Sequence, residues 1–89
     1  MYTKLKEVLH DAFIQSSQGK GKERHSSGEA FENQPILEIT RRLGLGYPLG
    51  QAVKKIYESQ RLDKDASMRE LLGAIVYIAG AVVRLKELI

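Results

Sequence analysis

The sequence predicts an all-α protein, a small bundle of about four helices. Apolar residues recur at the three- and four-residue spacing of a helix in successive segments, and no segment shows the alternating pattern of a strand. The length of 89 residues is that of one domain, near the lower limit at which a single hydrophobic core suffices. A single compact domain is therefore expected.

Residues 1–15 form the first predicted helix, which is amphipathic. Its apolar residues fall on one side, and charged residues fall on the other. The apolar set consists of Leu5, Val8, Leu9, Ala12 and Phe13. We expect about four turns, with this side buried against another helix.

Residues 16–33 are predicted to be a flexible loop or linker. Positions 16–28 hold three glycines and four serines and no aliphatic side chain. Because this segment separates the first helix from the rest, that helix could dock on its own subunit or swap onto a neighbouring one. The segment Gly19-Lys20-Gly21-Lys22 is no phosphate-binding P-loop, since no strand precedes it and no Ser or Thr follows either lysine.

Residues 34–89 are predicted to be the compact helical unit. Asn33 is a plausible N-cap, with Pro35 in the first turn of a short helix that ends at Gly44. Pro48 suits the start of the next helix. The expected buried sides hold Ile36, Leu37, Ile39, Thr40 and Leu43 in the first of these helices, and Leu49, Ala52, Val53, Ile56 and Tyr57 in the second.

The last predicted helix contains thirteen consecutive residues without a charge, from Leu71 to Val83. Its N-terminus is expected either at Asp65 as N-cap or at a capping box formed by Ser67 and Glu70. The run is shorter than the roughly 18 to 20 apolar residues that span a bilayer, and charged residues bracket it. We therefore expect a core helix of a soluble protein and no membrane partner.

On a helical wheel this segment separates into two faces. The broad aliphatic face is expected to be core and holds Leu71, Leu72, Ile75, Ile78, Ala79, Val82 and Val83. The opposite stripe consists of Gly73, Tyr77, Gly80 and Arg84. Each glycine costs about 1 kcal/mol relative to alanine in a helix, so the stripe indicates close approach of a neighbour. That neighbour is a helix of the same subunit, a second subunit or a ligand. The stripe is the predicted interface of a homo-oligomer.

The formal net charge is +3, and the surplus lies after residue 33. Between positions 41 and 64 basic residues outnumber acidic ones, which indicates a mild basic patch that suits a polyanion. The candidate polyanion-binding residues are Arg41, Arg42, Lys54, Lys55 and Arg61. Nucleic acid or another protein is thus a possible partner.

Several chemistries are not expected. The chain has no cysteine, which excludes disulfides, thiolate zinc sites and thiol nucleophiles. His10 and His25 have no ligand at metal-binding spacing, and we expect no metal, no cofactor and no catalytic residues. Cytoplasmic localisation is the default, because no export signal is visible. Paired carboxylates, Glu58 and Glu70 among them, are the remaining enzymatic option, as magnesium ligands.

The segments Leu49-Gly50-Gln51-Ala52-Val53-Lys54-Lys55-Ile56 and Glu70-Leu71-Leu72-Gly73-Ala74-Ile75-Val76-Tyr77-Ile78 resemble a family of small helical proteins encoded by phages and prophages. The family has no known function and is sometimes loosely labelled nucleotide-kinase-like. Gly44-Leu45-Gly46-Tyr47 resembles its turn, and the resemblance covers about residues 34 to 80. Lys55 and Glu58 depart from the family pattern, which has tyrosine and arginine there. The resemblance implies a phage-type accessory protein that acts by association and binding.

A weaker similarity is to all-α nucleoside triphosphate pyrophosphatases, in which paired acidic residues on neighbouring helices hold magnesium. Here Gly73 stands where an aspartate would follow Glu70. The alternative function is therefore nucleotide binding, or a degenerate magnesium-dependent pyrophosphatase. In that alternative Glu58 and Glu70 contact magnesium and Lys54 contacts phosphate.

Overall fold

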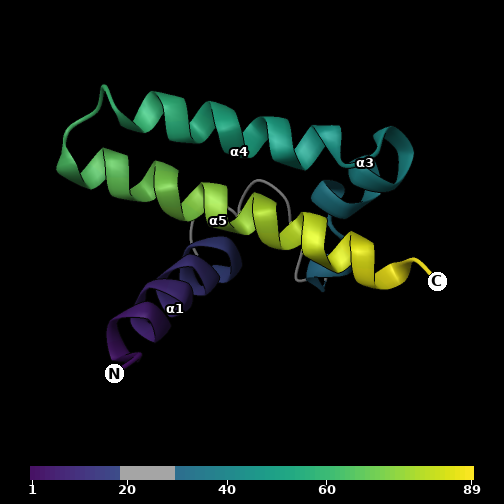
Figure 1. The fold of residues 1–89 in the computed structure, drawn as a ribbon, viewed down its shortest axis with the longest axis horizontal. Helices are drawn as coiled ribbons and strands as arrows, with labels where there is room; N and C mark the ends of the chain where they lie inside the picture. Colours follow the sequence, from purple (N-terminus) through teal and green to yellow (C-terminus); the bar gives the residue numbers. More distant parts are fainter. Residues whose placement is uncertain (19–29) are drawn as a thin grey trace.

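A computed structural model describes residues 1–18 and 30–89 of the chain, and Figure 1 shows their arrangement. The described part is helical and holds no strand, so the predicted small all-α bundle of about four helices is confirmed. Residues 19–29 of the predicted loop lie outside this part. The elements are α1 (Thr3–Gln18), the short 3-10 helix η1 (Phe31–Asn33), α3 (Pro35–Leu43), α4 (Gly46–Ser59) and α5 (Lys64–Glu87).

Helices α4 and α5 form an antiparallel hairpin, which is the most extensive contact between helices in the described part (Figure 1). The rings of Tyr47 and Tyr77 meet edge to face across it, with centroids 6.0 Å apart. Burial, followed by the contact with Tyr77, raises the pKa of Tyr47 above its ordinary value. These aromatic contacts hold the start of α4 against the middle of α5.

The turn between α4 and α5 corrects both predicted caps of the last helix. Asp63 is the N-cap, and its carboxylate accepts a hydrogen bond of 2.9 Å from the backbone N–H of Ala66. The Ser67 hydroxyl instead donates to the carbonyls of Ser59, at 2.5 Å, and Leu62, at 3.1 Å. Asp65 lies within the first turn. The hydroxyl of Ser67 is therefore engaged in closing the hairpin and forms no capping box.

Helix α3 packs on both members of the hairpin. Pro35 is its first residue and Gln34, not Asn33, is its N-cap. The predicted glycine stop is confirmed: Gly44 has φ +89°, and its N–H donates to the carbonyl of Thr40 at 2.7 Å. Leu37 and Thr40 are fully buried, and the Thr40 hydroxyl donates to the carbonyl of Ile36 at 2.6 Å.

Helix α1 lies on the opposite side of α5 from α4 (Figure 1). It ends at Gln18, beyond the predicted end at residue 15. The Ser16 and Ser17 hydroxyls both donate to the carbonyl of Phe13 in its last turn, at 3.0 and 2.7 Å. Gln15 donates from Nε2 to the carbonyl of Arg69 on α5 at 3.0 Å. Polar side chains thus finish α1 in a segment that lacks apolar periodicity.

The core is small and made mostly of alanine. Its buried hydrophobic residues in the described part are Ala12, Leu37, Ala52, Ala74 and Ala81. Most larger apolar side chains expected in the core are exposed, which corrects the predicted buried faces. The exposed ones are Leu5, Val8, Leu9 and Phe13 on α1; Leu43 on α3; Leu49, Val53, Ile56 and Tyr57 on α4; and Leu71, Ile78 and Val82 on α5, where Ala79 is also exposed.

Gly50, in the second turn of α4, provides a test of helix propensity in the absence of packing contacts. A Cβ added at Gly50 would meet no heavy atom within 4 Å, and the residue is exposed. Gly50→Ala is therefore expected to raise the free energy of unfolding by about 0.5–1 kcal/mol, measured by urea denaturation. Gly44→Ala is the contrasting control, because its left-handed backbone strains any L side chain and should lower stability. An equal response of the two variants would contradict the prediction.

Candidate association surface

The stripe formed by Gly73, Tyr77, Gly80 and Arg84 faces helices of the same subunit. A Cβ at Gly73 would lie 3.1 Å from Cδ of Lys55 on α4. A Cβ at Gly80 would lie 3.0 Å from Cδ1 of Ile36 on α3. The glycines therefore allow close packing within the subunit, which is the first of the three alternatives that the sequence left open.

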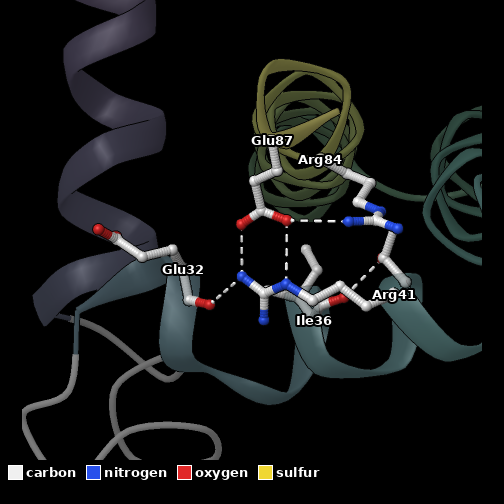
Figure 2. A network of polar contacts seen from close by, with 6 residues as sticks. Glu32, Ile36, Arg41, Arg84 and Glu87 are labelled. Carbon is white, nitrogen blue, oxygen red and sulfur yellow. Dashed lines mark hydrogen bonds and ion pairs between the residues drawn. The ribbon is translucent and has the colours of Figure 1, made fainter. Parts of the chain in front are cut away.

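An ion-pair network joins the C-terminal end of α5 to α3 (Figure 2). Arg41 donates from Nε and Nη2 to the two carboxylate oxygens of Glu87, at 2.9 and 2.5 Å. Its Nη2 also donates to the carbonyl of Glu32 at 2.8 Å. Arg84, the last member of the stripe, approaches the same carboxylate at 3.4 Å. The network is a bidentate pair with added donors, the strongest ion-pair geometry available to arginine.

This network predicts an acid-dependent contribution to stability. The hydrogen bond from Arg41 holds the pKa of Glu87 below its ordinary value of 4.5. A carboxyl with a depressed folded pKa stabilises the protein above its unfolded pKa, and this contribution is lost as the pH falls through the folded pKa. Glu87→Gln should therefore destabilise at pH 7, and its difference from wild type should shrink below about pH 4.5.

Denaturant unfolding at neutral and acid pH measures this difference. The matched control is Glu7→Gln, which removes an exposed carboxylate of α1 that makes no ion pair among the described residues. A Glu87→Gln deficit that stays constant down to about pH 3 would contradict the assignment.

Three of the five predicted polyanion-binding residues form ion pairs within the subunit. Arg41 is engaged by Glu87, and Lys55 pairs with Glu70 at 3.3 Å. Lys54 lies 4.0 Å from Glu58 with a side chain 68% exposed. The five residues are distributed over α3, α4 and the following turn. The two remaining members are Arg42, which is exposed, and Arg61, whose guanidinium lies 5.3 Å from the Tyr57 ring centroid.

The acidic residues of the nucleotide alternative lie against lysines. Glu70 pairs with Lys55, whose ammonium also lies 5.8 Å from the Tyr77 ring centroid, and Glu58 faces Lys54. Among the described residues no three His, Cys, Asp or Glu side chains are grouped to hold a metal ion. In this arrangement the carboxylates neutralise lysines of the α4–α5 hairpin.

A row of apolar side chains runs along α5, and we call it the α5 ridge. It consists of Met68, Leu71, Ile75, Ile78, Val82 and Leu85. Ile75 is half-buried, and the other five are 43% to 52% exposed. The residues follow each other at alternating intervals of three and four. That spacing is visible in the sequence and could have marked the ridge as a separate surface.

Helix α5 is also the one described helix long and apolar enough, by length and composition, to cross a bilayer. Its residues include Lys64, Asp65, Arg69, Arg84 and Lys86, and 22% of its most apolar window is buried inside the protein. The central helix of a soluble protein meets the same criterion, so this property does not discriminate between the two settings.

Comparison of the chain with protein-family models, with curated proteins and with solved structures finds no match.

Proposed function

We propose that this protein acts by self-association and by binding a macromolecular partner, as a phage- or prophage-type accessory protein, and not by catalysis. The observation that supports the proposal best is the α5 ridge. A row of six large apolar side chains, five of them about half exposed, runs along the central helix of a domain whose core is mostly alanine. Ordered exposed apolar surface of this kind is typical of interaction sites.

Burial of the α5 ridge against a partner would stabilise the complex through the hydrophobic effect. Fully burying a large aliphatic side chain contributes about 1.5–3 kcal/mol, so the exposed half of each ridge residue represents roughly 1 kcal/mol. Two copies of the ridge would together contribute on the order of 10 kcal/mol. Association costs an estimated 4–15 kcal/mol in lost freedom, so the ridge is of the right size to drive self-association at a modest affinity.

Nucleic acid is the proposed class of second partner. Arg42 and Lys54 are exposed, and the net charge is +3. Contacts with phosphates make binding fall steeply with salt, because bound counterions are released. Retention on immobilised DNA or RNA at low salt, lost as salt rises, would support this partner. No retention at low salt would leave protein as the partner.

The primary experiment is the mass of the protein in solution, measured by sedimentation velocity over a wide concentration range. The chain has a mass of 10.0 kDa, and the proposal expects a species of at least twice this mass at high concentration. A monomer at every concentration, together with no retention on nucleic acid, would contradict the proposal. Thermal shift with nucleoside triphosphates and magnesium tests the alternative, since a ligand that binds the folded state raises Tm.

A further inference from the structure

We propose that the occupant of the α5 ridge is a second copy of this chain, with the two α5 helices antiparallel about a twofold axis. The inference rests on the self-association in the proposed function and adds the surface, the orientation and the register. Three features of α5 carry it: the period of the ridge, the residues behind and beside it, and the charges at its ends.

The period of the ridge is that of a coiled coil. Alternating intervals of three and four average 3.5 residues, and they hold from Met68 to Leu85 without interruption. This repeat keeps one seam of side chains facing a partner helix along its length. On the opposite side of the helix, Gly73 and Gly80 lie against α4 and α3. Helix α1 packs on a further part of α5, and five of the six seam residues remain 43% to 52% exposed.

The residues that flank the seam are mostly small. In heptad terms the ridge residues occupy positions a and d, with Met68 at a. The central flanking positions are Leu72 and Ala79 at e, and Ala74 and Ala81 at g. Ala74 and Ala81 are buried within the subunit, whereas Ala79 is exposed and leaves room on the e side for a second helix to approach closely. The e side of the seam therefore suits a helix as the occupant.

The charges at the two ends of α5 select the antiparallel orientation. With Ile75 of one copy opposite Ile78 of the other, Met68 lies opposite Leu85, and every ridge residue is matched. In this register the e positions bring Asp65 beside Lys86 of the second copy, and twofold symmetry repeats the pair at the other end. Both residues are exposed, and neither makes an ion pair within the described residues.

The parallel orientation has the opposite electrostatic result. There each ridge residue meets its own counterpart, and Lys64, at the d position before Met68, faces the Lys64 of the second copy. Like charges that meet across a seam disfavour that pairing. A lipid surface also fits the ridge less well, because the ridge contains no aromatic residue and helices that bind membrane interfaces are typically rich in them.

Cross-linking of single-cysteine variants tests the orientation, and the absence of native cysteine makes it specific. Met68→Cys and Leu85→Cys proteins are prepared separately, mixed, and treated with a short bismaleimide. The antiparallel register expects a dimer band from the mixture and only background from either variant alone. Efficient cross-linking of Met68→Cys by itself would establish the parallel orientation and overturn the proposal. No band above background in any sample, at a concentration where the wild type is dimeric, would also overturn it.

Two sets of variants test the surface by sedimentation, with helicity by circular dichroism as the check on folding. Ile78→Glu should raise the dissociation constant at least about a hundredfold, because it buries a carboxylate in the seam. The matched control, Leu43→Glu, makes the same kind of change at an exposed residue of α3 and should leave the constant unchanged. Asp65→Lys and Lys86→Asp should each weaken the dimer roughly tenfold, and the double exchange should restore it.

The outcomes separate this inference from the proposed function. A wild-type oligomer that Ile78→Glu leaves intact would overturn the assignment of the ridge while self-association stands. A wild type that is monomeric and binds no nucleic acid would overturn both. A monomeric wild type that cosediments with vesicles of phosphatidylcholine and phosphatidylglycerol, and loses this binding in Ile78→Glu, would identify lipid as the occupant and overturn the second copy.

Discussion

Leu37→Ala is expected to lower the free energy of unfolding by about 2–5 kcal/mol, the largest effect of any single truncation in this protein. Leu37 is fully buried and is the one buried residue of the hydrophobic core, among the described residues, that is larger than alanine. It lies where α3 meets Gly80 of α5. Neighbouring alanines have no side-chain length with which to fill the cavity, so the truncation should cost toward the upper end of this range.

Urea denaturation measures this loss. The matched control is Leu43→Ala, the same change on the same helix at a residue 72% exposed, which should alter stability by less than about 0.5 kcal/mol. Because small domains have a free energy of unfolding of about 5–15 kcal/mol, Leu37→Ala should also populate the unfolded state measurably at moderate temperature. Equal effects of the two variants would contradict the described burial of α3.

Gly80→Leu is expected to destabilise the protein by about 1–3 kcal/mol or more, because α3 must move away from α5. Even a Cβ at this position would lie 3.0 and 3.3 Å from two carbons of Ile36 and 3.7 Å from Leu37. Gly73→Leu should cost less, since its nearest neighbour is the flexible end of Lys55.

Gly50→Leu is the control for Gly80→Leu, because it adds the same side chain to a helix where a Cβ meets nothing. It should be neutral or slightly stabilising. Thermal unfolding followed by circular dichroism compares the variants, and about 1 kcal/mol corresponds to roughly 4–8 °C in a domain of this size. A Tm for Gly80→Leu equal to that of Gly50→Leu would show that the stripe is not packed within the subunit.

Glycine and proline residues at helix boundaries made much of the fold predictable. Gly44 was identified as a helix stop and Pro35 as a first-turn residue, because each has a strong local preference. The first residue of α5 could not be predicted in the same way, because Asp63, Asp65 and Ser67 are all good N-caps and lie within five positions. The choice among them is tertiary, since the Ser67 hydroxyl bonds to carbonyls at the end of α4 and the turn that follows.

The faces of the helices were harder to assign than their existence. A helical wheel divided α5 correctly into an aliphatic face and a glycine stripe, but it could not say which face α3 and α4 would cover. The more apolar face was assigned to the core on hydropathy. In the structure the stripe is covered, because helices α3 and α4 approach the glycines closely, and Leu71, Ile78 and Val82 are left exposed.

The sequence allows part of the candidate site to be predicted. The three-four spacing of the ridge requires only counting, whereas its exposure depends on which neighbours pack behind α5. The basic residues were identified, but their internal pairing was not predictable. The Arg41 to Glu87 pair joins residues 46 positions apart, and no local pattern signals such a contact.

The attachment of α1 has a consequence for how the protein opens. Ala12 is the only buried residue among those described in α1, and the helix packs mainly on α5. Elements with little burial open at a lower free energy than the global transition. Amide hydrogens of α1 should therefore exchange with solvent well before those at the α3–α5 contact. Such early release would make α1 a separable arm, able to leave its place on one subunit while the rest stays folded.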